Sequence, residues 1–332
     1  MMAFERSPLL ESKLSSTTST SPFATPLPQQ SGSDDNVQLP VAIAHRGYKA
    51  AYPENTLRAF SAAVDIGAHA IETDIHLSKD KVVVLSHDAT LKRCFGKKEK
   101  LAECDWSYLS TLETLAEPKQ HMPRLVDLLA YLARPENERV WVLLDIKRDD
   151  DADELLGATA AAIASVESAV RWEKRVVLGA WSERYVELCR KHLPGFAVAF
   201  INWSLTEAER MLRESDVWFN LLQPSLVGPC GSRFIEEARS EGRPLFVWTV
   251  NRERWMHWSI RKGVDGVITD DPKLFLEVCE KWRAGGGQRR TTPGQFLRQV
   301  FVQFMMTAFA PLIWLVVRRK RIDKKRMVPV KV

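Results

Sequence analysis

Cysteine is scarce in this chain of 332 residues. The five cysteines are odd in number, widely spaced and never arranged as a C-x-x-C pair: Cys94, Cys104, Cys189, Cys230 and Cys279. This pattern argues against a disulfide framework and against a thiolate zinc site. It favours a globular domain that faces the cytosol.

The first 39 residues lack an apolar run long enough for a signal peptide. Ser, Thr, Pro and Gln dominate this segment, for example in SSTTSTSPFATPLPQQSGS. Such a composition cannot bury enough apolar surface to fold. It predicts a disordered leader over residues 1–39.

Negative charge is almost absent from the C-terminal end. Residues 289–332 hold 11 Lys and Arg against one acid, a net charge of +10, whereas the rest of the chain carries −5. Within this end, residues 299–317 (QVFVQFMMTAFAPLIWLVV) form a 19-residue stretch without a formal charge. A bilayer-spanning helix requires roughly 17 to 25 such residues.

These features predict a hinge and basic linker over 285–298, a hydrophobic membrane segment over 299–317 and a basic tail over 318–332. The segment either spans the bilayer or forms a shallow hairpin bent near Pro311, and a buried amphipathic helix of the globular part is the alternative. Basic flanks favour an anionic leaflet. We expect a membrane-associated protein at the mitochondrion, the endoplasmic reticulum or lipid droplets.

Between these ends, residues 40–284 alternate strand-like and helix-like stretches. Nine runs rich in β-branched and aromatic residues predict strands: 41–46, 70–75, 82–87, 140–146, 175–181, 196–202, 217–223, 245–250 and 265–270. The second and third runs are joined by the short turn SKDK, which predicts a hairpin, and helical segments separate the others. Residues 91–123 lack a clear strand and predict an insertion over the barrel mouth.

Eight parallel strands with crossover helices and one antiparallel strand predict a (β/α)₈ TIM barrel with an extra hairpin strand. A C-terminal membrane-associated helix would follow it. A doubly wound open sheet is the alternative, because the pattern by itself cannot show that the sheet closes.

Polar residues gather where the predicted strands end, which is where barrel enzymes carry their chemistry. Glu72 and Asp74 alternate on one strand and therefore point to the same face. We expect one site to unite the residues at these strand ends: His45, Arg46, Glu72, Asp74, His87, Asp145, Lys147, Trp248, Asn251, Thr269 and Asp270.

The residue types in this set indicate phosphoryl transfer. Converging carboxylates of Glu72, Asp74 and Asp145 would repel one another, and an oxygen-preferring divalent cation, Ca²⁺ or Mg²⁺, relieves that repulsion. The positive charges of Arg46 and Lys147 suit the phosphate of a phosphodiester. His45 and His87 can exchange a proton between the entering and the leaving oxygen. A lone E-x-D or a lone histidine is usually structural, so the hypothesis depends on their joint placement.

Residues 41–282 resemble the glycerophosphodiester phosphodiesterase family through an ordered set of motifs: HRG, PENT, E-x-D, SHD, D-x-K, VWTVN and GVDGVITDDP. The resemblance implies the following roles: His45 and His87 as catalytic acid and base, Arg46 and Lys147 as phosphate contacts, Glu72, Asp74 and Asp145 as metal ligands, and Glu54 and Asn55 as supporting residues. Many family members carry Glu where this chain has Asp145, which leaves the metal open between Ca²⁺ and Mg²⁺.

A barrel with a C-terminal membrane segment and a short insertion is similar to the fungal phosphatidylglycerol-specific phospholipase C branch. This similarity implies hydrolysis of phosphatidylglycerol to diacylglycerol and glycerol phosphate, with the headgroup hydroxyl as internal nucleophile. Five tryptophans follow or end predicted strands and could form an aromatic collar at headgroup level: Trp181, Trp203, Trp248, Trp255 and Trp258. Packing between helix and barrel is the alternative for Trp255 and Trp258. We expect Trp248 to belong to the substrate pocket.

Two alternatives remain at this point. One is a membrane-tethered phosphodiesterase of soluble deacylated phospholipids such as glycerophosphocholine, and the other is a catalytically silent membrane adaptor. Nucleic-acid binding is not expected, because the basic residues flank an apolar segment and form no recognisable module. The sequence makes no prediction of oligomeric state.

Overall fold

The computed structural model describes residues 39–286, 294 and 301. In the described part of the chain, nine strands form one sheet: β1 (Val41–His45), β2 (Ala70–Leu77), β3 (Val83–Leu85), β4 (Trp141–Ile146), β5 (Val176–Ala180), β6 (Ala197–Asn202), β7 (Trp218–Leu222), β8 (Leu245–Trp248) and β9 (Gly266–Thr269). Each of the nine predicted runs contains one of these strands or most of it.

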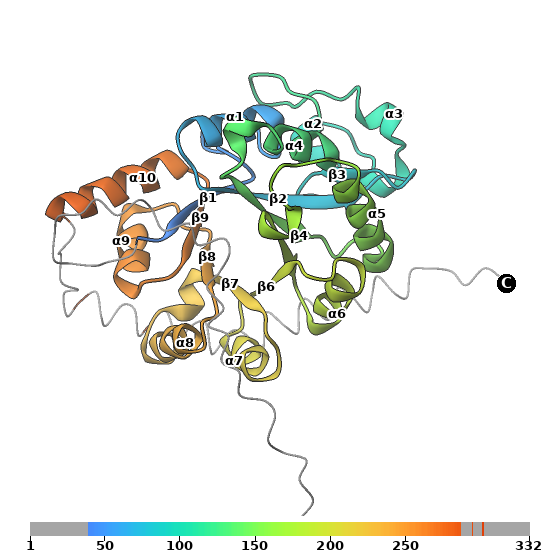
Figure 1. The fold of residues 1–332 in the computed structure, drawn as a ribbon. Coiled ribbons are helices and arrows are strands. Elements are labelled where there is room, and N and C mark those ends of the chain that lie inside the picture. The colour runs from blue at the N-terminus through green and yellow to red at the C-terminus, as the bar shows by residue number, and fades with distance from the viewer. Residues whose placement is uncertain (1–38, 287–293, 295–300, 302–332) are drawn as a thin grey trace, which may run out of the picture.

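The sheet closes into a barrel. Strand β1 pairs in parallel with both β2 and β9, so eight parallel strands form a ring in the order β1-β2-β4-β5-β6-β7-β8-β9. Strand β3 pairs with β2 in antiparallel fashion outside the ring, and Figure 1 shows the ring with β3 beside it. The TIM barrel with an extra hairpin strand is therefore confirmed, and the open doubly wound sheet is wrong.

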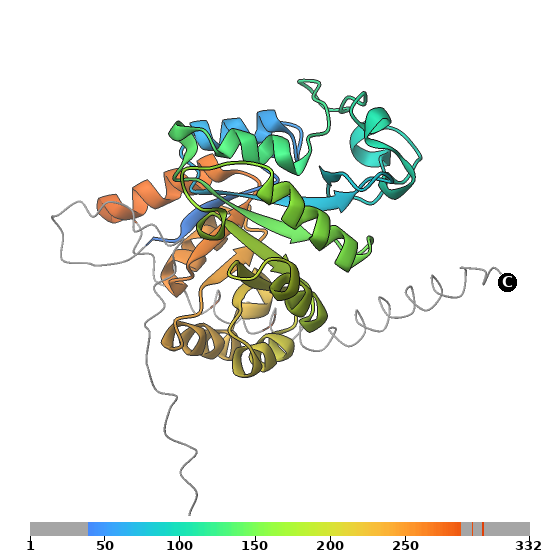
Figure 2. The same ribbon diagram turned by 45° about the vertical axis from the view of Figure 1, so that its right-hand side comes forward.

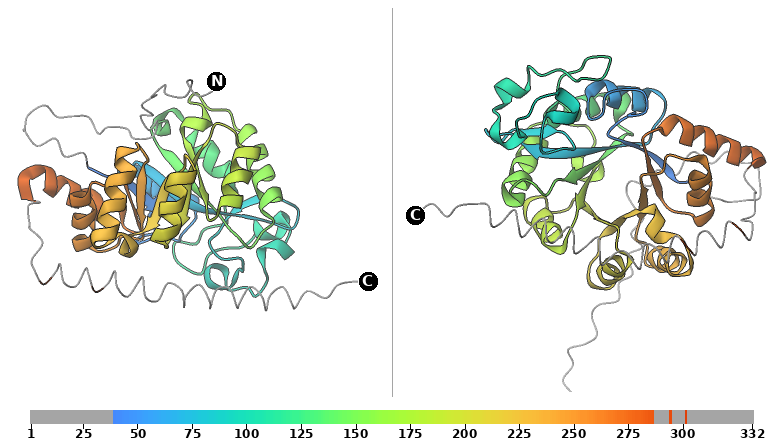
Figure 3. Two further views of the ribbon diagram at one scale, coloured as in Figure 1. Left: turned by 90° about the horizontal axis from the view of Figure 1, so that it is seen from below. Right: turned by 180° about the vertical axis from the view of Figure 1, so that it is seen from behind.

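Helices surround the barrel, as Figure 2 and Figure 3 show from further sides. They are α1 (Leu57–Asp65), α2 (Lys92–Phe95), α3 (Trp106–Leu109), α4 (Leu125–Leu132), α5 (Ala152–Ala164), α6 (Glu183–His192), α7 (Leu205–Glu214), α8 (Pro229–Ser240), α9 (Glu253–Lys262) and α10 (Pro272–Lys281). Short helical turns are η1 (Leu101–Glu103), η2 (Pro135–Asn137), η3 (Trp172–Lys174), η4 (Gln223–Leu226) and η5 (Trp282–Gly286).

The core has two layers, because the strands bury both of their faces. The outer layer lies between the sheet and the helices. Because the inner layer covers the other face of the sheet, all six residues of β4 (WVLLDI) are buried. The inner layer fills the barrel near the amino ends of the strands, where Trp141 and Trp218 both contact Phe246 with ring centroids 5.5 and 6.0 Å away. These rings fill this end of the interior, and a pocket opens at the other end.

The insertion over residues 91–123 contains α2, η1 and α3 and has a small core of its own. Its apolar side chains pack with Val84 of β3, and it lies at one side of the barrel (Figure 1, Figure 3). The expectation that it lies over the barrel mouth stays a prediction, because none of its residues belongs to the pocket lining. It reaches the rim of the barrel through Arg93.

The predicted C-terminal elements lie almost entirely outside the described residues. Of the membrane segment 299–317 only Phe301 is described, of the linker 285–298 only residues 285, 286 and 294, and of the tail 318–332 none. Of the leader 1–39 only Leu39 is described, and it is buried. Across the described residues, no helix combines the length and apolarity needed to cross a membrane.

Candidate active site

A pocket opens at the carboxyl ends of the barrel strands. The structure brings eight of the predicted site residues together in its lining: His45, Arg46, Glu72, Asp74, His87, Asp145, Lys147 and Trp248. Trp181, Ile201, Asn220, Thr249 and Ile268 complete the lining. His87 lies two residues beyond the end of β3 rather than on the strand itself. Glu54 and Asn55 do not line the pocket, but each forms a hydrogen bond with a residue that does: Glu54 with Arg46, and Asn55 with Asp74.

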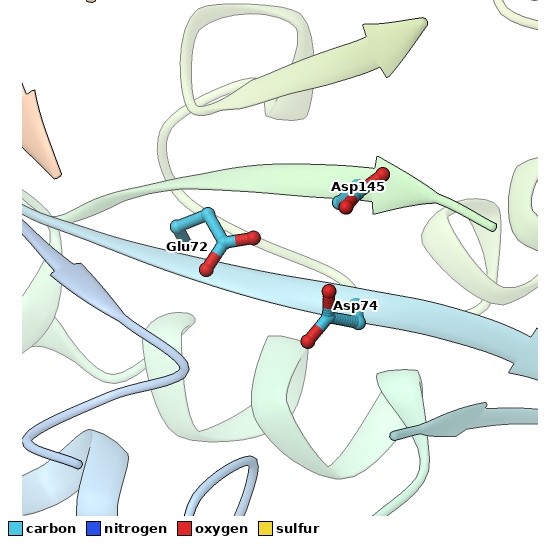
Figure 4. A group of neighbouring side chains, drawn as sticks. All are labelled: Glu72, Asp74 and Asp145. Atoms are coloured by element: carbon cyan, nitrogen blue, oxygen red, sulfur yellow. The ribbon is translucent and has the colours of Figure 1, made fainter. Parts of the chain in front are cut away.

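Three carboxylates converge on one side of the pocket. Glu72 and Asp74 project from β2, and Asp145 lies on β4 directly beside Asp74 in the strand register. Each residue offers an oxygen within 4.8 Å of the oxygens of the other two, and all three residues are buried. Figure 4 shows the three side chains gathered over these neighbouring strands.

Two cationic side chains neutralise part of this charge. The Lys147 ammonium lies 2.6 Å from both Asp74 and Asp145, and Arg46 Nε lies 3.3 Å from Asp74. Although burial favours the neutral acid, Lys147 and Arg46 lower the pKa of Asp74. Burial, followed by repulsion from Asp74 and Asp145, raises the pKa of Glu72 well above its ordinary value.

The cluster has the donor set of a divalent metal site. Ca²⁺ and Mg²⁺ prefer oxygen ligands, and Glu72, Asp74 and Asp145 supply them from rigid neighbouring strands. Three ionised acids would face two cations, so one negative charge stays unbalanced among these five side chains. Burial first, and then repulsion from Asp74 and Asp145, raises the pKa of Glu72. A divalent cation would remove the imbalance, and the residues present therefore fit such an ion.

His45 is held by a carboxylate that the sequence analysis placed near the site without giving it a role. Its Nδ1 lies 2.5 Å from Asp270 Oδ1, and Asn251 donates to the other oxygen of Asp270 at 2.8 Å. This leaves Nε2 facing the pocket, 3.9 Å from Glu72 Oε2. Burial lowers the pKa of His45, which favours the neutral imidazole, whereas His45 lowers the pKa of Asp270 to about 2 despite burial.

His87 is connected to Arg46 through Arg93 of the insertion. Its Nδ1 lies 2.8 Å from Asp88 Oδ1, and Arg93 Nε donates to the other oxygen of Asp88 at 2.7 Å. The two terminal nitrogens of Arg93 donate to Glu54, both at 2.7 Å, and Arg46 also donates to Glu54 at 2.9 Å. No sequence motif indicated a role for Arg93, because its partners lie on two separate loops.

The PENT stretch shapes the loop after β1. Thr56 caps α1 by accepting a hydrogen bond from the Ala59 N–H at 3.2 Å. Asn55, at φ 54°, donates to Asp74 at 2.8 Å and is therefore a direct support of the carboxylate cluster. Gly47, at φ 79°, lies so close to α1 that a Cβ would approach the Ala59 backbone to 2.7 Å, which requires glycine here.

Aromatic rings form another side of the pocket. Trp181 and Trp248 contact each other edge to face with centroids 5.9 Å apart, and Trp181 Nε1 donates to Asp145 Oδ1 at 2.6 Å. Trp248 lines the pocket, as expected. Trp255 and Trp258 instead pack with the outer core between helices and barrel. The collar interpretation is therefore wrong for these two, because α9 presents them to the sheet.

Comparison with known proteins agrees with this geometry. The sequence profile of the Glycerophosphoryl diester phosphodiesterase family matches residues 45–274, which is more than half of the chain. The chain belongs to this family. As a member of the glycerophosphoryl diester phosphodiesterase family it is a phosphoric diester hydrolase.

Individual relatives cover most of the chain. A glycerophosphodiester phosphodiesterase from Caldanaerobacter subterraneus is 26% identical over 253 residues, covering 73% of this chain and 98% of the relative. The crystal structure of a glycerophosphodiester phosphodiesterase from Thermotoga maritima matches with 26% identity and a TM-score of 0.57, over 72% of this chain and 98% of that one.

A more distant structure shares the fold. An Oleispira antarctica phosphodiesterase, solved in complex with its product sn-glycerol-3-phosphate, is 19% identical with a TM-score of 0.63. The match covers 73% of this chain and 97% of that one.

Proposed function

We propose that this protein is a metal-assisted phospholipase C that hydrolyses phosphatidylglycerol to diacylglycerol and glycerol phosphate at a membrane surface. The observation that carries the proposal is the composition of the pocket at the carboxyl ends of the strands. It joins a buried carboxylate cluster, two cationic side chains and two histidines, each histidine with its own carboxylate. The bound product of the Oleispira antarctica relative supports a glycerol phosphate product here.

Each residue has a role in this scheme. Arg46 and Lys147 bind the unesterified phosphate oxygens, and a cation held by Glu72, Asp74 and Asp145 would polarise the phosphoryl group. One imidazole accepts the proton of the attacking hydroxyl, and the other donates a proton to the leaving oxygen. Asp270 and Asp88 fix the orientation of His45 and His87, respectively. Trp248 contacts the glycerol.

The substrate supplies the nucleophile. The 2-hydroxyl of the headgroup glycerol attacks phosphorus, the bond from phosphorus to the diacylglycerol oxygen breaks, and that oxygen takes up a proton. A cyclic glycerophosphate results, and water opens it to glycerol phosphate. Phosphatidylglycerol has this hydroxyl next to its phosphate, whereas the headgroup of phosphatidylcholine does not.

We expect the purified full chain to release diacylglycerol from phosphatidylglycerol vesicles at least about 100-fold faster than from phosphatidylcholine vesicles, since only the former lipid can use the internal route. The measurement is diacylglycerol release from each vesicle type under matched conditions. Equal rates would contradict the internal nucleophile. Rapid cleavage of glycerophosphocholine without cleavage of either vesicle would favour the alternative of a soluble, deacylated substrate.

We propose that the C-terminal segment 299–317 attaches the protein to an anionic leaflet, with the barrel facing the cytosol. The net charge of +10 over 289–332 favours such a surface. Attachment would raise the local concentration of a lipid substrate around the barrel. Among the mitochondrion, the endoplasmic reticulum and lipid droplets, the mitochondrion is the first to examine.

A substitution of Arg93 tests whether the insertion helps to position the residues of the pocket. Arg93→Met removes the donors that orient Glu54 and Asp88, so we expect kcat to fall about 10-fold, in line with the loss of charge-assisted hydrogen bonds. KM should also rise, because Glu54 can then bind Arg46 more fully and compete with the phosphate. Steady-state kinetics on a soluble glycerophosphodiester measure both constants.

The neighbouring residue provides the control for this variant. Lys92→Met removes a positive charge from the same short helix at an exposed position and should leave both constants within about twofold, as expected of a surface substitution. If the two variants behaved alike, the network through Arg93 would have no part in positioning the site.

A further inference from the structure

Asn220 is a buried polar residue in the pocket that the scheme above does not use. Its exposed fraction is 3%, and it belongs to the pocket lining. Its side-chain oxygen has no hydrogen-bond partner among the described residues. Its neighbour in the strand register on β6 is Ile201, which has no side-chain donor to offer. Buried polar atoms in proteins rarely lack a partner.

The position of Asn220 in the barrel directs its side chain inward. Trp218, two residues earlier on β7, belongs to the interior cluster, and side chains two residues apart on a strand share a face. Strand β7 is four strands from β2 around the ring in either direction. Asn220 therefore lies across the barrel from Glu72 and Asp74.

The surroundings hold Asn220 in place. The indole N–H of Trp248 donates to the Asn220 backbone oxygen at 3.0 Å, and Trp248 contacts Trp181. The strand is thus fixed beside the aromatic wall, while the side-chain oxygen is buried and has no partner among the described residues. Leaving a buried acceptor unpaired destabilises the folded protein, and a ligand that donates a hydrogen bond removes this cost. A carbonyl oxygen can only accept, so the ligand group must carry a hydrogen.

We propose that Asn220 accepts a hydrogen bond from the terminal hydroxyl of the substrate's glycerol, the hydroxyl that does not attack phosphorus. Asn220 then selects headgroups that carry this second hydroxyl. The inference rests on the proposed function, because it places the glycerol in the same pocket. A substrate without that hydroxyl would leave the acceptor unpaired in the complex, which makes such sites selective.

Two soluble phosphodiesters test the proposal on the full chain. One carries glycerol, and the other carries propane-1,2-diol, which keeps the attacking hydroxyl and lacks only the terminal one. The wild-type protein should prefer the glycerol diester by about 10- to 100-fold in kcat/KM. Asn220→Leu should abolish this preference through a loss on the glycerol diester alone. Asn220→Ala, which removes the acceptor without adding bulk, should abolish it too.

Thermal stability provides an independent readout. Because Asn220→Leu removes an unpaired buried acceptor, the ligand-free variant should melt about 2–4 °C higher than wild type. Asn202 is the matched control, since its side-chain oxygen accepts from the Trp203 and Ser204 N–H groups at 2.8 Å. Asn202→Leu should lower the melting temperature and leave the substrate preference intact.

Several outcomes would overturn the inference. Equal loss on both diesters with a lower melting temperature would make Asn220 a structural residue. A wild-type protein that cleaves both diesters equally well would refute the selective role of Asn220 while the proposed function stands. A wild-type protein that cleaves neither of the two diesters nor phosphatidylglycerol vesicles would refute the proposed function and this inference with it.

Discussion

His45→Gln lowers kcat by about 10²- to 10⁴-fold, the contribution typical of a general acid or base, and leaves the fold intact. Glutamine retains polarity and size at the end of β1 but cannot exchange a proton. The expected loss follows from the geometry, in which Asp270 holds Nδ1 and leaves Nε2 facing the carboxylate cluster. Steady-state kinetics on a soluble glycerophosphodiester, together with a thermal melt, measure both effects.

A surface histidine serves as the control for this experiment. His192 on α6 pairs with Asp153 away from the pocket lining, and His192→Gln should leave kcat unchanged within about twofold. Asp270→Asn should cost about 10-fold by itself and almost nothing in the His45→Gln background, because both changes remove the same interaction. A His45→Gln protein with wild-type turnover would exclude His45 from the proton transfer. A variant that lost turnover but kept the cellular effect of the wild-type protein would favour the catalytically silent adaptor.

Removing divalent cations lowers activity by at least about 10³-fold, given the several kcal/mol that a metal contributes to charge stabilisation at a phosphoryl group. Activity returns on adding back Ca²⁺ or Mg²⁺, and the ion that restores it at the lower concentration identifies the preferred metal. The measurement is turnover of a soluble glycerophosphodiester after chelation and dialysis, with the metal content determined in the same samples.

The affinity of the carboxylate cluster for a divalent cation should depend on pH. Because the pKa of Glu72 is raised, this acid remains protonated to a higher pH than usual, and the cation must displace the proton in order to bind. Apparent metal affinity should therefore fall as the pH is lowered through the raised pKa. Glu72→Gln should weaken metal binding and flatten this dependence. Full activity of the metal-free protein would contradict the proposed role of the cluster.

The local sequence determined much of this protein. Strand length, β-branched composition and the short turn SKDK predicted the nine strands, because a strand buried on both faces requires a continuous apolar run. The spacing of two between Glu72 and Asp74 placed both on one face, since side chains alternate along a strand. Barrel strands share one functional end, so their terminal polar residues could be assigned to one pocket before any contact was known.

The tertiary structure alone decided which side chains meet. His45 contacts Asp270 across a sequence separation of 225 residues, because closure of the ring places β1 beside β9. Arg93 reaches Glu54 and Asp88 because the insertion packs on β3 at one side of the barrel. The unpaired oxygen of Asn220 depends on what surrounds it inside the closed barrel. Periodicity reports the face that a residue occupies, whereas its partners depend on distances that exist only after the chain has folded.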